Sequence, residues 1–196
     1  DTGSVAATTL TTLDSGVPGT VTANDVATVT GTATQVAAAA EADRLGTLVL
    51  KANFAATISD EGSVVATDLT KITARTSETI NVTAVTKLTG TAAEVVAAID
   101  DAQVNHDANF LVELTADSTA AAADLKTINT ATSGIITATG VTAITGSASD
   151  VTDVLAVETS QGNAGQQIDL DTDFTVTISD TGSVAATTLT TLDSGV

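Results

Sequence analysis

The sequence predicts an α/β protein made of repeated coils, each with a strand and a helix, in which the strands form a parallel sheet. Three observations lead to this prediction: one segment occurs twice, two shorter signatures occur three times each, and aromatic residues are nearly absent. Only three phenylalanines stand among 196 residues, so the core must use small and β-branched side chains. Such side chains fill a narrow interior at native density, but not a wide globular one.

The duplicated segment is the clearest sign of repetition. Residues 1–17 read DTGSVAATTLTTLDSGV, and residues 180–196 read the same letters. Repeats of this kind are typical of solenoids, in which each unit packs on its neighbours. We interpret residues 1–196 as a single solenoid with units at approximately 1–59, 60–116 and 117–179, and with 180–196 starting the next copy. The expected partners are therefore copies of the same chain or adjoining repeats.

The first half of each unit is predicted to be a strand followed by a helix. The strand follows a phenylalanine in the phrases ANFAATISD, ANFLVELTAD and TDFTVTISD, where apolar and polar residues alternate. Phe54, Phe110 and Phe174 are expected to share one position and to stand in single file. The next stretch is rich in threonine, which has low helix propensity. A right-handed β-solenoid, in which this stretch is a loop, is therefore the alternative architecture.

An aspartate ends each of these strands and is expected to cap the helix that follows it. A carboxylate there can accept hydrogen bonds from the free amides of the first turn and lies at the positive end of the helix dipole. The aspartates at this repeat position are Asp1, Asp60, Asp117 and Asp180.

The second half of each unit has a glycine between a short strand and a helix. These glycines are Gly31, Gly90 and Gly146. A hydroxyl residue follows each of them and precedes an acid or amide by three positions, as in Thr32 with Gln35, Thr91 with Glu94 and Ser147 with Asp150. This is the spacing of a capping box, in which two side chains satisfy two helix amides reciprocally. Aspartate is shorter than glutamate, so the third box is expected to be weaker.

Charge and composition exclude several functions. The chain has 24 acidic and six basic residues and a formal net charge of −18, which argues against nucleic acid or an anionic membrane as partner. The sequence contains no run of about 18 apolar residues, the length that would predict a membrane-spanning helix. Without cysteine there is neither a disulfide framework nor a thiolate metal site.

No catalytic residue and no cofactor are expected. His106 is the only histidine, and the other repeats have none at its position, so a solvated loop residue is the simpler interpretation. A serine nucleophile on a strained turn would need a GxSxG motif, which does not occur. The sequence therefore argues against an enzyme.

Calcium is the one metal for which the sequence offers a candidate site. Asp169, Asp171 and Asp173 form a DxDxD run like the opening of a calcium loop. The glycine and glutamate that an EF-hand needs at its sixth and twelfth positions are absent, which counts against that motif. The alternative is structural, because Asn53, Asn109 and Asp173 share the position before phenylalanine, where polar side chains can satisfy a turn.

The phrases TISDTGSVAATTLTTLDSG and VTAITGSASDV resemble the tandem repeats of very large secreted or cell-surface proteins of cyanobacteria, which are hemolysin-like or adhesin-like. The resemblance covers essentially the whole chain and implies an extracellular or cell-surface location and a structural or adhesive role. It carries over no catalytic residue. The glycine-rich nonapeptide of calcium-binding rolls is absent from this sequence.

Two functions are therefore expected. The first is a structural repeat segment of an extracellular fibre, sheath or surface protein, which continues head to tail. The second is a module that binds ice, carbohydrate or another surface through a flat sheet face, since phrases such as TVTI would place threonine hydroxyls in rows. Threonine is also simply a favourable strand residue.

Overall fold

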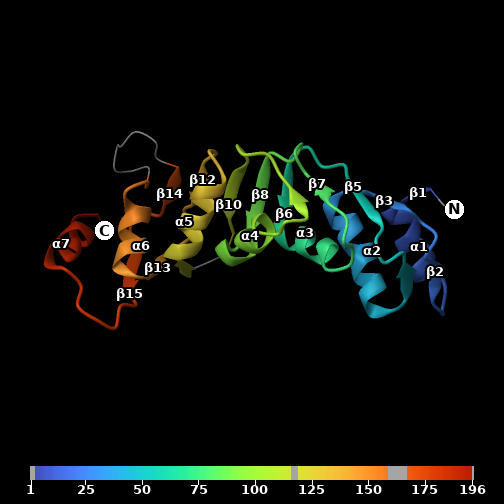
Figure 1. Cartoon of the computed structure of the whole chain (residues 1–196), viewed down its shortest axis with the longest axis horizontal. Helices are drawn as coiled ribbons and strands as arrows, with labels where there is room; N and C mark the ends of the chain where they lie inside the picture. Colours follow the sequence, from blue (N-terminus) through green and yellow to red (C-terminus); the bar gives the residue numbers. More distant parts are fainter. Residues whose placement is uncertain (1–2, 116–118, 159–166, 196) are drawn as a thin grey trace. The chain divides into compact units, whose positions relative to one another are not determined.

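The computed structural model describes residues 3–115, 119–158 and 167–195 of the chain (Figure 1). The chain divides into two compact units, one formed by Asp1–Thr86 with Ala97–Asp107 and the other by Lys87–Val96 with Ala108–Val196. Strands and helices alternate in both units. The strand pairs described within each unit are parallel, which confirms the α/β class and the parallel sheets.

The first unit contains three strand and helix coils. Its elements are β1 (Ser4–Ala6), α1 (Ala7–Gly16), β2 (Val21–Ala23), β3 (Thr28–Gly31), α2 (Ala33–Leu45), β4 (Leu48–Leu50), β5 (Ala55–Ile58), β6 (Ser63–Val65), α3 (Ala66–Thr73), β7 (Ile80–Asn81) and β9 (Val104–Asn105). Its main sheet has the order β1-β3-β5-β7-β9, and β2 pairs with β4 in a second sheet. Strands that precede a helix and strands that follow one thus meet in one sheet.

The second unit repeats this organisation. Its elements are β8 (Lys87–Gly90), the first part of α4 (Ala92–Ile99), β10 (Leu111–Leu114), β11 (Thr119–Ala121), α5 (Ala122–Ala131), β12 (Ile136–Ala138), β13 (Ala143–Gly146), α6 (Ala148–Leu155), β14 (Ile168–Leu170), β15 (Thr175–Ile178) and α7 (Ala186–Gly195). Within the unit, β8, β10, β12 and β14 pair in this order, and β11, β13 and β15 form a three-stranded sheet.

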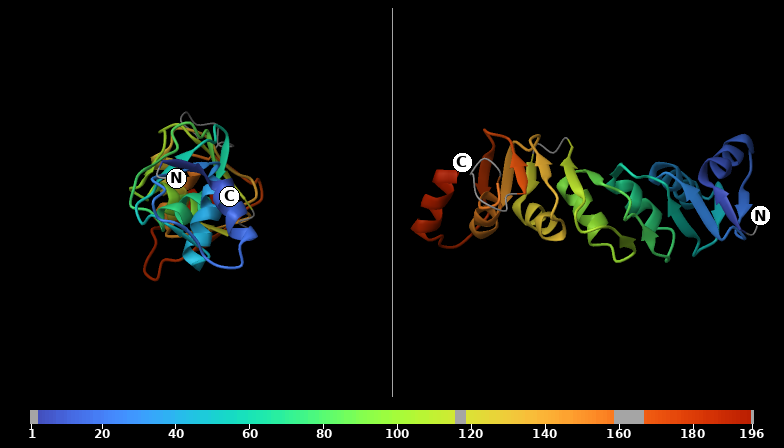
Figure 2. Two further views of the ribbon diagram at one scale, coloured as in Figure 1. Left: turned by 90° about the vertical axis from the view of Figure 1, so that its right-hand side faces the viewer. Right: turned by 90° about the horizontal axis from the view of Figure 1, so that it is seen from above.

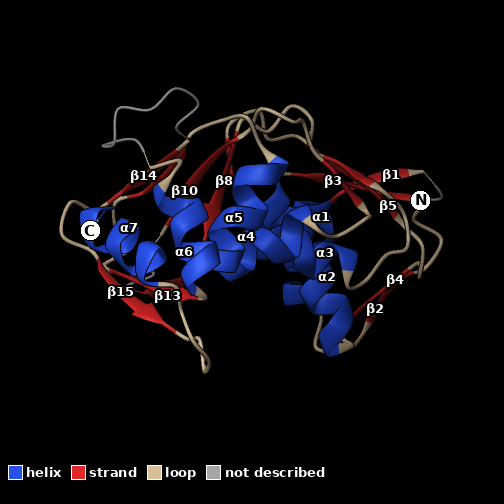
Figure 3. Ribbon diagram, turned by 60° about the vertical axis from the view of Figure 1, so that its left-hand side comes forward, coloured by secondary structure: helices blue, strands red, loops and turns tan. Residues whose placement is uncertain are grey.

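Helices of successive coils lie side by side within each unit. In the first unit α1 packs on α2 and α2 on α3, and in the second α5 packs on α6 and α6 on α7 (Figure 2). Figure 3 shows that the helices of each unit lie beside the strands of that unit. The close packing depends on small residues, since Ala33, Ala37, Ala39 and Ala40 of α2 are all buried. Small side chains let helix axes approach closely.

The threonine-rich stretches are helical, so the alternative in which they are loops is wrong. Threonine hydroxyls in α1 hydrogen-bond to carbonyls one turn earlier, from Thr11 to Ala7 at 3.1 Å and from Thr12 to Thr8 at 2.7 Å. The same bonds occur in α7, from Thr190 to Ala186 and from Thr191 to Thr187, both at 3.0 Å. Packing of the apolar face then outweighs the low helix propensity.

The three phenylalanines are buried, and each immediately precedes a strand. Phe54 leads into β5, Phe110 into β10 and Phe174 into β15. Their shared repeat position therefore carries a shared local structure. Their alignment in single file along the whole chain stays a prediction.

The repeat glycines end the strands that lead into α2, α4 and α6. Gly31 adopts a φ of +153°, and a Cβ atom there would lie 2.8 Å from Oε1 of Gln35. At Gly146 a Cβ atom would lie 2.9 Å from the Cβ of Ala122 in the preceding coil. Close approach to the capping side chain or to the neighbouring helix is thus the reason for glycine at this position.

Candidate self-association site

The predicted capping boxes begin the helices of the second half of each repeat. In α2, Gln35 N donates to Thr32 Oγ1 at 3.3 Å and Thr32 N donates to Gln35 Oε1 at 3.0 Å. Thr91 and Glu94 form the same pair at 3.2 and 2.8 Å. In the third copy, Asp150 N donates to Ser147 Oγ, but the short Asp150 side chain accepts from the Ser147 hydroxyl at 2.7 Å. The weaker third box is thus confirmed.

The aspartates at the strand ends cap a different helix from the one expected. Asp60 Oδ2 accepts from Ala33 N at 2.6 Å and Asp180 Oδ2 accepts from Ala148 N at 2.7 Å, so they cap α2 and α6 of the preceding coil. The helix that follows Asp60 has no side-chain cap. Strand pairing between coils is the cause. β5 and β15 pair with β3 and β13, which lead directly into α2 and α6, so the ends of β5 and β15 lie beside the starts of these helices. Asp1 and Asp117 lie outside the described residues.

Charged side chains also tie neighbouring coils together. In the first unit, the buried Asp43 carboxylate of α2 accepts from Arg75 Nε at 2.7 Å and from Leu50 N at 2.8 Å. Asp68 of α3 accepts from the Thr34 hydroxyl of α2 at 2.8 Å. These contacts bind each coil to the one before it.

In the second unit, Lys126 of α5 reaches two carboxylates of α6. Its ammonium lies 2.6 Å from Asp153 and 3.2 Å from Asp150. The hydrogen bonds with Asp153 and Asp150 raise the pKa of Lys126. The pKa of Asp150 is lowered, first by the hydrogen bond from Ser147 and then by that from Lys126. The charge pair therefore favours the ionised form of Asp150.

Two of the strands that follow a phenylalanine, β5 and β10, pair with a strand of the next repeat. In the first unit, β5 belongs by sequence to the first repeat, but the order β5-β7-β9 joins it to two strands of the second, with Thr57 opposite Asn81. In the second unit, the order β10-β12-β14 does the same, with Glu113 opposite Thr137. Backbone hydrogen bonds therefore interlock successive repeats.

Two strands lack this pairing among the described residues. The last phenylalanine strand, β15, pairs with β13, and no described residue pairs with its other edge. At the start of the chain, β2 pairs with β4, and its outer edge has no partner among the residues described. Val176 of β15 and Val21 of β2 are only half-buried, whereas their repeat counterparts Val112 and Ile136 are buried. Both edges are thus apolar and open.

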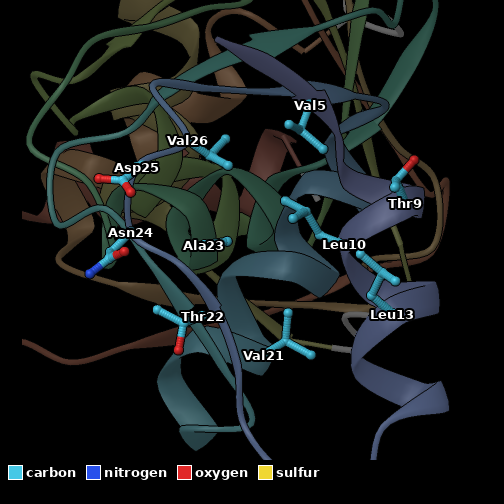
Figure 4. A pocket seen from close by; sticks show the side chains of 10 residues that line it. All are labelled: Val5, Thr9, Leu10, Leu13, Val21, Thr22, Ala23, Asn24, Asp25 and Val26. Atoms are coloured by element: carbon cyan, nitrogen blue, oxygen red, sulfur yellow. The ribbon is translucent and has the colours of Figure 1, made fainter. Parts of the chain in front are cut away.

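A hollow of about 210 Å³ lies beside the open edge of β2. Figure 4 shows Leu10 and Leu13 of α1 on one side of it and Val21, Ala23 and Val26 on another. An apolar cavity of about 150 Å³ can hold a benzene ring. The hollow is therefore large enough to take apolar side chains from a further strand.

The two copies of the duplicated segment differ in which leucine they bury. In the first copy Leu10 is 3% exposed and Leu13 is 50% exposed, while in the last copy Leu189 is 49% exposed and Leu192 is 6% exposed. These are matching positions in identical sequences. In the inner repeats both positions are fully buried, at Leu69 and Ile72 and at Leu125 and Ile128. The helix thus has two neighbouring apolar positions, one turn apart, and each terminal copy buries a different one.

On the described strands of each unit, directly paired threonines form no long rows. The register pairs Thr30 with Thr57 and Thr145 with Thr177, but Thr28 lies opposite Ala55 and Thr137 lies between Glu113 and Asp169. Within each unit, the described rows of directly paired threonines are only two residues long.

The acidic run at the end of the second unit lies on β14 and the turn after it. Asp169 is in β14, and a side-chain hydrogen bond between Asp171 and Asp173 lowers the pKa of Asp171 and raises that of Asp173. In the described part of the chain, no three His, Cys, Asp or Glu residues are grouped so that they could hold a metal ion. Calcium binding by Asp169, Asp171 and Asp173 stays a prediction.

His106 contacts the backbone of the residue that follows it. Its Nδ1 atom lies 2.8 Å from the carbonyl oxygen of Asp107, in the loop between β9 and Phe110. The expectation that His106 is a solvated loop residue without a catalytic role is not tested by this contact and stays a prediction.

A buried threonine recurs in both units and links neighbouring coils, and the sequence alone did not predict this contact. Thr76 and Thr132 are buried, and their hydroxyls donate to the carbonyl oxygens of Phe54 and Phe110, both at 2.5 Å. Each hydroxyl also accepts from the amide two residues later. The signal available in the sequence was the recurrence of threonine before Ser in TARTSE and TATSG.

None of the helices in the described ranges is both long and apolar enough to cross a membrane. Comparison of the chain with models of known protein families, with curated proteins and with solved structures finds no match.

Proposed function

We propose that this chain is a structural segment of an extracellular fibre, sheath or cell-surface layer, in which copies associate head to tail. In this proposal the coils of both units form one solenoid, and the solenoid continues from the end of one copy into the beginning of the next. The partner is therefore a second copy of the same chain or an adjoining repeat.

The observation that carries the proposal is the complementary burial of the two terminal helices. α7 buries Leu192 and exposes Leu189, while α1 buries Leu10 and exposes Leu13. A single helix placed between α6 of one copy and α2 of the next would bury both positions, as α3 and α5 do. Full burial of a leucine contributes about 1.5–3 kcal/mol relative to leaving it exposed.

The open strand edges supply the backbone part of the proposed junction. Thr177 of β15 matches both Thr57 and Glu113 in the repeat, and Thr22 of β2 matches both Asn81 and Thr137. The first unit pairs Thr57 with Asn81, and the second pairs Glu113 with Thr137. Both registers thus lead to the same expected pair, Thr177 of one copy opposite Thr22 of the next. Val176 would then lie beside Val21, next to the hollow lined by Leu10 and Leu13.

Surface binding through rows of threonine has less support. Such binding needs a regular array of like side chains, and the described threonine pairs are interrupted by Ala55, Glu113 and Asp169. The net charge of −18 favours a hydrated surface, which suits a fibre or layer that must stay soluble along its sides.

The proposed junction is tested by blocking one edge at a time with proline. Thr175 N donates to Thr142 O and Ser179 N to Gly146 O, so the amide of Val176 points away from β13 toward the open edge. Val21 N donates to Thr47 O, so the amide of Thr22 points away from β4. Val176→Pro and Thr22→Pro therefore each remove a donor at one open edge and spare the existing sheets.

In analytical ultracentrifugation, we expect the unmodified protein to form head-to-tail oligomers as its concentration rises. Each variant alone should stay monomeric. An equimolar mixture should form dimers and nothing larger, because only the intact edge of each variant can pair. Circular dichroism and melting curves serve as controls for folding. A mixture that stays monomeric, or single variants that still form long chains, would contradict the proposal.

A further inference from the structure

The surface formed by β3 and α2, here called the β3–α2 site, holds the first copy of the duplicated segment. We infer that this site also binds residues 182–195 of a second copy of the chain, in place of its own residues 3–16. The inference rests on the proposed head-to-tail association and specifies what happens to the duplicated segment at each junction.

The structure shows in detail how this sequence fits the β3–α2 site. Ser4, Val5 and Ala6 pair in parallel with Thr28, Val29 and Thr30. The carbonyl oxygen of Gly3 accepts from Ala27 N at 3.1 Å and from Thr28 N at 3.2 Å. In α1, Ala7 and Leu10 are buried, and Asp14 accepts a 3.0 Å hydrogen bond from the Thr47 hydroxyl. Each of these residues recurs in the last copy.

The last copy has these groups but not these contacts. Ser183–Ala185 matches β1 but lies outside the strands, and Ala186 and Leu189, which match the buried Ala7 and Leu10, are exposed. α7 packs on α6, and its Leu192 is buried. Binding at the β3–α2 site of a second copy would form the missing strand and bury Leu189, while the contacts with α6 remain.

Only one helix fits at each junction, whereas the two copies bring two. In the first unit one helix, α3, stands between β5 and its partner β7, and in the second unit α5 stands between β10 and β12. Between β15 of one copy and β2 of the next, α7 and α1 would compete for a single place. Because their sequences are identical, the exchange replaces each lost contact by the same contact, as in domain swapping.

This competition leads to an unusual expectation for a destabilising substitution. Leu10→Ala weakens the hold of the first copy on its own site but leaves Leu189 intact in every last copy. We therefore expect Leu10→Ala to lower the concentration at which copies associate by more than about tenfold. In this variant only Leu189 of a second copy can bury a leucine at the β3–α2 site. Sedimentation of the full-length variant over a range of concentrations measures this shift.

The matched control is the double variant Leu10→Ala with Leu189→Ala. Leu189 is exposed in the single chain, so its loss should leave the melting temperature of Leu10→Ala unchanged and remove the gain in association. If the double variant associates as strongly as Leu10→Ala, or if Leu10→Ala associates no more strongly than the unmodified chain, the inference is wrong.

Disulfide trapping tests the site without destabilising it, since the chain has no cysteine of its own. Ser4 pairs with Thr28, and Ser183 is the counterpart of Ser4. A Ser183→Cys chain mixed with a Thr28→Cys chain should give a crosslinked dimer on mild oxidation. Thr30→Cys, two residues further along β3, is the register control and should crosslink far less. Ser4→Cys with Thr28→Cys in one chain is the positive control for geometry.

The outcomes separate the two proposals. If the proline variants form dimers on mixing but Ser183→Cys and Thr28→Cys do not crosslink, head-to-tail association stands and the exchange of the duplicated segment is wrong. If the proline mixture stays monomeric, the association itself is wrong, and any crosslink between these cysteines would have to come from another arrangement.

Discussion

At the scale of single residues, one close backbone contact ties two coils together in the second unit. The Thr132 hydroxyl donates to the carbonyl oxygen of Phe110 and accepts from Gly134 N at 2.9 Å. A Cβ atom on Gly134 would lie only 2.2 Å from the carbonyl oxygen of Phe110. In this copy the backbone at Gly134 thus lies too close to Phe110 to admit a side chain, whereas Glu78 holds the matching position in the first unit.

Gly134→Ala should lower the free energy of unfolding by about 1–3 kcal/mol, the usual cost of forcing an extra group into a packed site. The cause would be the displacement of the backbone at Phe110. Gly62→Ala is the matched control, because nothing lies within 4 Å of a Cβ atom there. Thermal or urea unfolding of both variants measures the difference. Equal stability of the two would contradict the contact.

A second expectation at this scale concerns pH. The pKa of Asp150 is lowered by hydrogen bonds from Ser147 and Lys126, so its ionised form is favoured in the folded chain. Its stabilising effect is therefore present above the ordinary aspartate pKa and is lost as the pH falls through the lower value of the folded state. Ser147→Ala should reduce this part of the acid sensitivity. The variant should be less stable than the unmodified chain at pH 7, where Asp150 is ionised in both. Below pH 4 this difference in the free energy of unfolding should become smaller, and unfolding curves at both pH values measure it.

Local sequence predicts local contacts well and lateral contacts poorly. The capping boxes of Thr32 and Thr91 could be predicted because both partners lie three residues apart on one helix. The partner of Asp60 is Ala33, which only the pairing of β5 with β3 brings near. For the same reason the bond from Thr76 to Phe54 could not be inferred from the chain around either residue.

At the scale of elements, the link between α2 and the segment after α3 depends on one buried carboxylate. Asp43 accepts from Arg75 and from Leu50 N, and its side chain is 8% exposed. A buried charged group that loses its partner carries an uncompensated desolvation cost. This contact therefore holds α3 against α2 more firmly than the exposed ion pairs do.

Arg75→Met should destabilise the first unit by about 1–3 kcal/mol, because Asp43 would stay buried with one fewer donor. Arg44→Met is the control, since Arg44 pairs with Glu41 on the exposed surface of one helix and should change stability little. Hydrogen exchange of α2 and α3 amides measures the local effect. A larger loss in Arg44→Met than in Arg75→Met would be inconsistent with these roles.

The sequence predicted the helices, the strands after the phenylalanines and the strands that end in the repeat glycines, but neither the short strands directly before α1, α3 and α5 nor most of the strands after the helices. β2, β4, β7 and β9 are two or three residues long and carry little alternation. They exist because a neighbouring strand of another coil lies beside them, as β4 does for β2. Pairing across coils, rather than local propensity, decides such short strands.

The candidate association site was predicted only in outline. The identity of residues 1–17 and 180–196 indicated that the stack continues into another copy. Which leucine each copy buries depends on the helix beside it, α2 for α1 and α6 for α7, and therefore required the structure.

At the scale of the whole molecule, the repeat seen in the sequence and the repeat seen in the sheets are out of phase. The strands β5 and β10 each belong to one repeat by sequence and pair on one side with a strand of that repeat, but on the other side each pairs with a strand of the next repeat. A repeat is thus completed only by its neighbour, as in other proteins whose units cannot bury their apolar surface alone. In the proposed head-to-tail association, the open edges of β15 and β2 would form this same connection.

The most direct measurement of head-to-tail continuation is a disulfide between the two open edges. Thr22→Cys in one chain and Thr177→Cys in another should form a crosslinked dimer, because paired strands bring Cα atoms within disulfide range. Thr57→Cys with Asn81→Cys in one chain should form the same bond internally. A register-specific crosslink between copies is the expected result. No crosslink between copies, with the internal control formed, would contradict the continuation of the sheet from one copy to the next.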